Sequence, residues 1–159
     1  MSTDNAKTLP LLSLRNLVLF PGAMMPVEIG RASSLRLIEA LGGKGARVLV
    51  LGFTFKENVP DVRNTGVVSI VHTLRDYGVE VAVWDPHADP AEVQHEYAIE
   101  LTDLDRIGEV DAVVLAVPHE GSAELALRRV SEHDVPVLID VKGAIDRKRV
   151  PATTRYWRL

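Results

Sequence analysis

Residues Arg47-Val48-Leu49-Val50-Leu51, followed at once by Gly52, form a continuous run of mostly branched apolar side chains. A strand with one face in water alternates polar and apolar residues, so an unbroken apolar run is typical of a strand buried on both faces. Such strands occur in parallel sheets that helices cover on both sides. The stretch therefore predicts the first strand of an α/β fold.

Helices and strands alternate along the chain that follows. A helix capped by Asn64 or Thr65 is predicted to run to residue 77, because apolar residues then recur every three or four positions and Gly78 ends the pattern. Later helices are predicted over 91–97 and 122–133, the last capped by Ser122, and later strands over 79–84, 111–117 and 135–141, with candidate short strands at 99–101 and 154–157. This order predicts an α/β, Rossmann-like fold with a three-layer parallel sheet.

The residues before this unit have a different pattern. Short apolar stretches broken by turn residues, among them Pro21-Gly22, predict a β arm within residues 9–29. Ser33 or Ser34 can cap a short helix that Gly42 and Gly43 end. The run Gly42-Gly43-Lys44-Gly45 precedes a strand, whereas a phosphate-binding loop follows one, so we interpret it as a flexible junction.

Composition narrows the class of protein. The 159 residues are 47% apolar and 25% charged, an ordinary globular balance, and the net charge of −4 gives no global basic field for nucleic acid. No apolar run is long enough to span a bilayer and the first residues are polar, so we expect a cytoplasmic protein without membrane association. The absence of cysteine excludes disulfides, thiolate zinc sites and a cysteine nucleophile in this chain.

Several basic side chains follow the predicted strands. Parallel strands end at one edge of the sheet, where open α/β sheets bind their ligands. We therefore expect one rim to carry Lys56, Arg63, His87, His119 and Lys142. Fixed cations at strand ends and helix N-termini suit phosphate or pyrophosphate. The alternative is that these residues are solvated loop charges and hydrogen-bonded turn residues.

Three other motifs carry little functional signal. The stretch Asp85-Pro86-His87-Ala88-Asp89 lacks a further ligand at a known metal spacing, so no metal site is predicted. The pair His119 and Ser122 does not form a nucleophile elbow, so no catalytic residue is predicted. The basic residues of 142–158 are diluted by acids and match no RNA-binding motif, so no nucleic-acid partner is expected.

The stretch LGFTFKENVPDVRNT at residues 51–65 resembles the opening of the C-terminal, UDP-sugar-binding domain of the UDP-glucose/GDP-mannose dehydrogenase family. The resemblance covers about residues 46–159. The motif KENVPDVRN (56–64) is most similar to the branch of the family that oxidises UDP-N-acetylhexosamines for surface polysaccharides. The later motifs that match are YGVEV (77–81), WDP (84–86), the 111–119 strand, DVKG (140–143) and YWRL (156–159).

The resemblance implies roles for four residues. Phe55 and Lys56 match a pair that contacts the nucleotide sugar, and Lys142 matches a basic residue that approaches substrate from a neighbouring subunit. Arg63 matches an arginine that reaches toward NAD held by another domain. UDP-sugar is thus the implied ligand, NAD the cofactor of the parent family, and a homo-oligomer or a chain with the NAD-binding domain the implied partner.

The N-terminal residues resemble a different family. The segments LPLLSLRNLVLFPG (9–22) and PVEIGR (26–31) are similar in sequence to the start of the Lon protease N-terminal domain. We therefore expect three parts: a Lon-like β arm and helix at 1–41, a junction at 42–45, and a dehydrogenase-like domain at 46–159. The chain looks like a hybrid of the two families.

Departures from the dehydrogenase family decide the expected activity. That family uses a catalytic cysteine and a glycine-rich NAD-binding domain, and this chain has neither. We expect it to bind no cofactor by itself and to be inactive alone. Three interpretations stay open: a UDP-sugar-binding domain, a chimeric or designed scaffold without function, and a protein-interaction module that uses the Lon-like arm.

Overall fold

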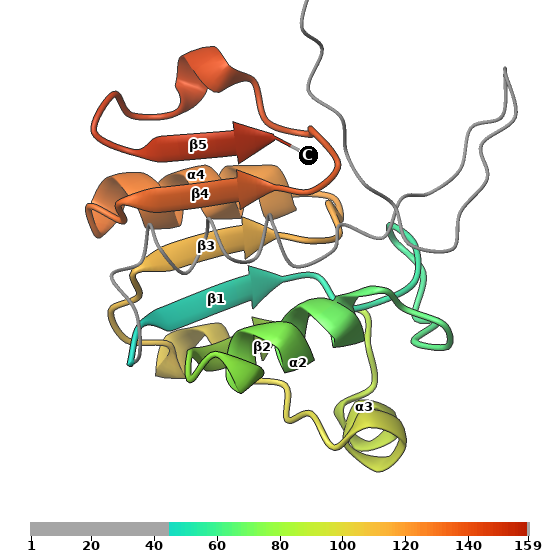
Figure 1. Ribbon diagram of the computed structural model, residues 1–159. Helices are drawn as coiled ribbons and strands as arrows, with labels where there is room; N and C mark the ends of the chain where they lie inside the picture. Colours follow the sequence, from blue (N-terminus) through green and yellow to red (C-terminus); the bar gives the residue numbers. More distant parts are fainter. Residues whose placement is uncertain (1–44, 159) are drawn as a thin grey trace, which may run out of the picture.

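A computed structural model describes residues 45–158 of the protein. Its centre is a five-stranded parallel sheet in the order β2-β1-β3-β4-β5 (Figure 1). The strands are β1 (Arg47–Leu51), β2 (Glu80–Trp84), β3 (Ala112–Leu115), β4 (Val137–Asp140) and β5 (Arg155–Arg158). The predicted parallel α/β sheet is therefore confirmed. Because every pairing is parallel, the strands end at the same side of the sheet, as the arrowheads visible in Figure 1 indicate.

Helices cover the two faces of this sheet. The helix α2 (Val67–Asp76) lies in front of β1 and β2 in Figure 1, and α4 (Ser122–Glu132) lies behind β3 and β4. Alternate residues of β1 point to the two faces, so Val48 and Val50 pack with α2, whereas Leu49 and Leu51 belong to the cluster that contains α4. This two-sided packing explains the unbroken apolar run of β1.

A third helix, α3 (Pro90–Tyr97), lies beyond the β2 edge (Figure 1). Asp89 caps it by accepting hydrogen bonds from the backbone N–H groups of Ala91 and Glu92. Two short 3-10 helices, η1 (Leu104–Arg106) and η2 (Arg147–Arg149), complete the elements. Among residues 45–158, the longest helices are too short and too polar to cross a bilayer.

Some predicted boundaries differ from the structure. The helix α2 begins at Val67 rather than at residue 65 or 66. Asn64 has a left-handed φ of 58°, and the Thr65 hydroxyl, two positions before the helix, accepts the Val67 N–H. Ser122 does not cap α4: it is buried as the first helical residue, and Gly121, with φ of 79°, stands at the cap. The candidate strand at 99–101 is reduced to a single bridge between Leu101 and Val83.

The candidate strand at the C-terminus is confirmed as β5, which pairs with β4 in parallel register at one edge of the sheet. The predicted Lon-like arm, its helix and residues 42–44 of the junction lie outside the described residues.

Candidate functional site

The loop after β1, residues 52–62, carries two of the predicted site residues. Gly52 turns the chain with a φ of 89°, and a Cβ there would collide with the carbonyl group of Val117. The Phe55 N–H then donates to the Asp61 carbonyl at 2.8 Å and closes the loop on itself. Phe55 is 58% exposed, the one exposed large hydrophobic residue in the described part of the chain, and Lys56 beside it is also exposed.

The loop after β4 carries Lys142. The buried carboxylate of Asp140, the last residue of β4, accepts hydrogen bonds from the backbone N–H groups of Ala144 and Ile145 and from the Tyr156 hydroxyl. Burial, together with this bond to Asp140, raises the pKa of Tyr156 to about 12. The buried Asp140 carboxylate therefore holds the backbone of this loop, and the Lys142 side chain lies at the surface.

An ion pair joins the loop after β1 to the loop after β4, which are far apart in the sequence. The Lys142 Nζ lies 2.7 Å from the Glu57 Oε1, across 85 residues of chain. The hydrogen bond and charge of Lys142, with a weaker contribution from Lys56, lower the pKa of Glu57 below its ordinary value. The loop that carries Lys56 and the loop that carries Lys142 are therefore joined at the same rim through Glu57.

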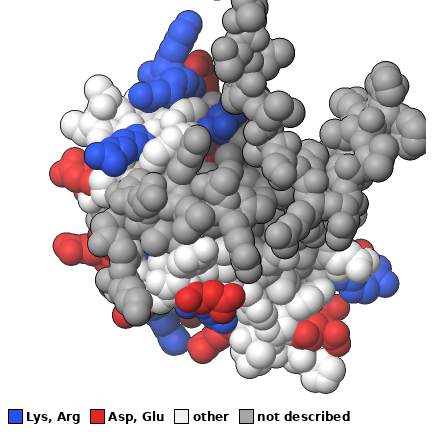
Figure 2. Space-filling view, in the orientation of Figure 1, with Lys and Arg blue, Asp and Glu red and all other residues white. Residues whose placement is uncertain are grey.

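Arg63 is on the surface, directly after the loop of residues 52–62. Its guanidinium makes two hydrogen bonds of 2.9 Å to the Asp61 carboxylate, through Nε and one terminal nitrogen. The hydrogen bonds from Arg63 lower the pKa of Asp61 to about 2. Acid and base thus alternate along this loop, in keeping with Figure 2, where basic and acidic groups lie side by side on the visible described surface.

Of the residues predicted to share the rim, His119 fits the alternative of a hydrogen-bonded turn residue. This residue follows β3 but is only 2% exposed, and its Nε2 lies 2.8 Å from the Asp85 Oδ2. Its Nδ1 accepts the backbone N–H of Asn58 at 2.9 Å. His119 is therefore a buried link between loops, because its two ring nitrogens are already used by protein groups.

Asp85, the partner of His119, is equally hidden, with no exposed side-chain surface. Burial raises its pKa, but hydrogen bonds from four backbone N–H groups outweigh this and leave the pKa below its ordinary value of 3.8. The donors are those of Phe53, His87, Thr54 and Ala88. The Asp-Pro pair that ends β2 is thus a structural anchor for two rim loops.

His87 is the predicted rim histidine that does remain exposed. Its ring centroid lies 4.7 Å from that of His119, with the planes tilted by 60°. The ring therefore covers the buried histidine from the solvent side of the rim.

Arg158 is a rim cation that the sequence analysis missed. It ends β5, opposite Asp140 in the β4–β5 register, and its guanidinium lies against Gly143, where a Cβ would collide with it. The signal was present in principle, since any residue at the carboxyl end of a parallel strand belongs to this edge.

The described residues do not fit a bound dinucleotide. A dinucleotide site places pyrophosphate on a helix that begins directly after the first strand, and an acid after the second strand on the ribose. Here α2 begins only at Val67, well after β1 ends at Leu51. The acid that ends β2, Asp85, has both oxygens engaged by the protein and no exposed surface.

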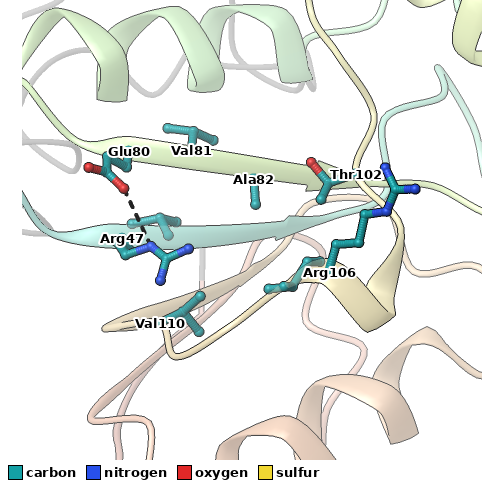
Figure 3. Close-up of a pocket in the computed structure, with 9 residues that line it drawn as sticks. Arg47, Glu80, Val81, Ala82, Thr102, Arg106 and Val110 are labelled. Carbon is teal, nitrogen blue, oxygen red and sulfur yellow. Dashed lines mark ion pairs between the residues drawn. The ribbon is translucent and has the colours of Figure 1, made fainter.

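A separate hollow of about 210 Å³ lies beside the first residues of β1 and β2, away from the rim at their carboxyl ends (Figure 3). Two arginines line it, but Arg47 pairs with Glu80 at 3.4 Å and Arg106 with Asp103 at 3.6 Å. The rest of the lining is Glu80, Thr102 and apolar side chains, so nothing in the hollow points to a particular ligand. Within residues 45–158 there is also no cluster of three metal-binding side chains.

Comparison with known proteins agrees with the rim motif. Residues 49–147 match the family model described as "UDP-glucose/GDP-mannose dehydrogenase family, UDP binding domain". The chain belongs to this family. A UDP-N-acetyl-D-glucosamine 6-dehydrogenase of Pseudomonas aeruginosa is 39% identical over 133 residues, which are 80% of this chain and 30% of that protein.

A solved structure shows the same fold. The UDP-D-ManNAc dehydrogenase of Pyrococcus horikoshii superposes with a TM-score of 0.63 at 23% identity, over 80% of this chain and 30% of that one. The chain therefore spans about 30% of the length of these family members.

The resemblance to Lon protease is also found. The Lon protease of Parabacteroides distasonis is 62% identical over 72 residues, which are 42% of this chain and 9% of that protein. This alignment is longer than the 9–41 stretch on which the resemblance was first based. The chain is thus similar to two families, and only the dehydrogenase family matches more than half of it.

Proposed function

We propose that the chain binds the diphosphate of a UDP-sugar at the rim between the loop after β1 and the loop after β4. The observation that carries this proposal is the placement of Glu57. Its carboxylate lies 2.7 Å from the Lys142 Nζ, and Lys56 also contributes to lowering its pKa. An anionic oxygen is therefore already held by Lys142, close to the loop that carries Lys56, and a cation that binds an anionic oxygen also suits a diphosphate.

The roles of single residues follow the family resemblance. In this proposal Lys56 and Lys142 bind the phosphates, and the exposed ring of Phe55 packs against the nucleotide sugar. Arg63 faces outward toward NAD held by another domain. The names of the relatives support a UDP-N-acetylhexosamine as the sugar nucleotide.

Titration calorimetry with UDP tests the proposal. We expect wild type to bind UDP and the Lys56→Ala variant to bind about tenfold more weakly, because a charged hydrogen bond to phosphate is lost. Arg155→Ala is the matched control: it removes the same charge from an exposed residue at the opposite edge, where β5 begins. Saturating UDP without heat or thermal shift would favour a scaffold without ligand binding.

Turnover is a separate question from binding. We propose that this chain alone does not oxidise a UDP-N-acetylhexosamine, since it contains no cysteine and its described residues do not fit a dinucleotide. A partner that supplies an NAD-binding domain and a nucleophile is then required. Purified chain mixed with NAD and UDP-N-acetylglucosamine should give no NADH, and measurable NADH would overturn this part of the proposal.

A further inference from the structure

One buried side chain connects the segments that follow three strands, β1, β2 and β3. His119 lies in the loop after β3, its Nε2 contacts Asp85 at the end of β2, and its Nδ1 contacts Asn58 in the loop after β1. The side chains of His119 and Asp85 have no exposed surface. A histidine so placed cannot touch a ligand at the rim, so whatever it contributes is made through the loops.

The contacts of His119 define its proton position. The Asn58 backbone N–H can only donate, so Nδ1 must accept and carries no proton. The single ring proton therefore lies on Nε2, which faces the Asp85 Oδ2 at 2.8 Å and the Thr54 Oγ1 at 3.3 Å. The two ring nitrogens thus face a donor on one side and acceptors on the other, which fixes the orientation of the ring.

The loop that carries Phe55 and Lys56 is anchored through this pair at both ends. At its start, Asp85 accepts the N–H groups of Phe53 and Thr54, at 2.5 and 3.0 Å. Beyond Lys56, Asn58 adopts a left-handed φ of 58° while its N–H donates to His119.

Two further bonds tighten the same loop. The Thr54 hydroxyl donates to the Lys56 carbonyl at 3.0 Å. The Asn58 Oδ1 accepts the Glu120 N–H at 2.8 Å, next to His119 in the chain. The backbone of residues 53–58 is therefore held by hydrogen bonds to the buried side chains of Asp85 and His119, which contact each other.

We propose that His119 is a positioning residue for the rim, which holds the 53–58 loop so that Lys56 faces the ligand. This inference rests on the proposed binding of UDP and adds to it a residue that never contacts the nucleotide. The bond from the Asn58 N–H to Nδ1 is the decisive one, because it fixes the strained residue that follows Lys56 and Glu57.

Two substitutions separate the two bonds of the ring. The amide oxygen of asparagine reaches as far as Nδ1 does, so His119→Asn can still accept from Asn58 but leaves Asp85 without its partner. The amide of glutamine reaches as far as Nε2, so His119→Gln can still donate to Asp85 but leaves the Asn58 N–H unpaired. Both variants alter the same buried site, which makes each a control for the other.

Two measurements on the full chain are needed. Titration with UDP should show affinity about tenfold weaker in His119→Gln and within about threefold of wild type in His119→Asn. Amide hydrogen exchange without nucleotide should be at least about tenfold faster at Asn58 in His119→Gln than in His119→Asn. Val130→Ala, which removes buried volume from α4, controls for lost stability and should leave UDP affinity unchanged.

The proposal is overturned if His119→Gln keeps both wild-type affinity and a protected Asn58 amide. It is equally overturned if both His119 variants and Val130→Ala weaken UDP binding in proportion to their thermal destabilisation. If wild type does not bind UDP, the proposed function fails, and the exchange at Asn58 alone decides whether His119 positions the loop.

Discussion

Paired charges set the character of the rim at the scale of single residues. Lys142 is neutralised by Glu57 and Arg63 by Asp61, so two of the predicted ligand-binding cations already have carboxylate partners. Exposed pairs of this kind are weak, which means that a phosphate can displace the carboxylate at small cost. Glu57 therefore competes with any anion that binds Lys142.

Removing the Glu57 charge should strengthen UDP binding. We expect Glu57→Gln to raise the affinity about threefold, because Lys142 loses its internal partner. Calorimetric titration at low salt measures the change. Glu132→Gln, with the same change of charge at the far end of α4, should bind UDP as wild type does. Equal or weaker binding by Glu57→Gln would show that Glu57 does not compete with the ligand.

Asp85 should contribute to the pH dependence of stability. Its folded pKa lies below the ordinary value of 3.8, so its stabilisation is present above that pH and is lost as the pH falls through the folded pKa. Asp85→Asn should lower the free energy of unfolding at neutral pH by about 2–4 kcal/mol, since buried N–H groups lose acceptors. Urea unfolding from neutral pH to about pH 3 should show a shallower decline in the variant than in wild type. Parallel curves would contradict the assigned role.

Positions of residues at strand ends could be predicted from sequence, but their contacts could not. Lys56 and Lys142 follow β1 and β4, and the rule that parallel strands end together places them on one rim. His119 follows β3 by the same rule, yet it turns inward because Asp85 and Asn58 offer it two buried partners. Such pairing depends on residues that lie far apart in sequence, and spacing alone does not reveal it.

Two glycines in the turns between elements share a left-handed backbone conformation but differ in their surroundings. Gly52, where β1 ends, and Gly121, at the start of α4, both have positive φ. A Cβ at Gly52 would collide with Val117, whereas at Gly121 it would meet open space. Both glycines thus have a left-handed backbone, but only at Gly52 would a side chain also collide with a neighbour.

Alanine substitutions separate these effects. Gly121→Ala should lower the free energy of unfolding by about 1 kcal/mol, the cost of a left-handed alanine. Gly52→Ala should cost at least about 3 kcal/mol, because the loop after β1 must also move away from the end of β3. Chemical denaturation measures both. Equal losses would show that the close approach to Val117 does not constrain the turn.

Elements were most predictable where the apolar pattern was strongest. The runs in β1, β3 and β4 are buried at nearly every position, and the structure confirms these strands. The weaker 99–101 segment makes one bridge only, because it passes β2 at the sheet edge. The start of α2 shifted because Asn64 and Thr65 form a turn whose geometry residue type alone did not indicate.

For the whole molecule, the sheet order predicts where structure is most persistent. Within residues 45–158, the strands β1, β3 and β4 each pair on two sides, while β5 pairs only with β4. Amides of β3 should therefore exchange with solvent at least about tenfold more slowly than those of β5. Hydrogen exchange followed by mass spectrometry tests this. Equal protection of β5 would indicate that its outer edge is covered.

The shape of the rim has a consequence for redesign. Inward-facing acids, Asp85 and Asp140, hold the loop backbones by their N–H groups, whereas the outward-facing Phe55, Lys56 and Lys142 leave that framework untouched. In the proposed function, recognition and architecture thus belong to different side chains. Libraries that randomise the three outer positions can be screened for new nucleotide specificities without rebuilding the scaffold beneath them.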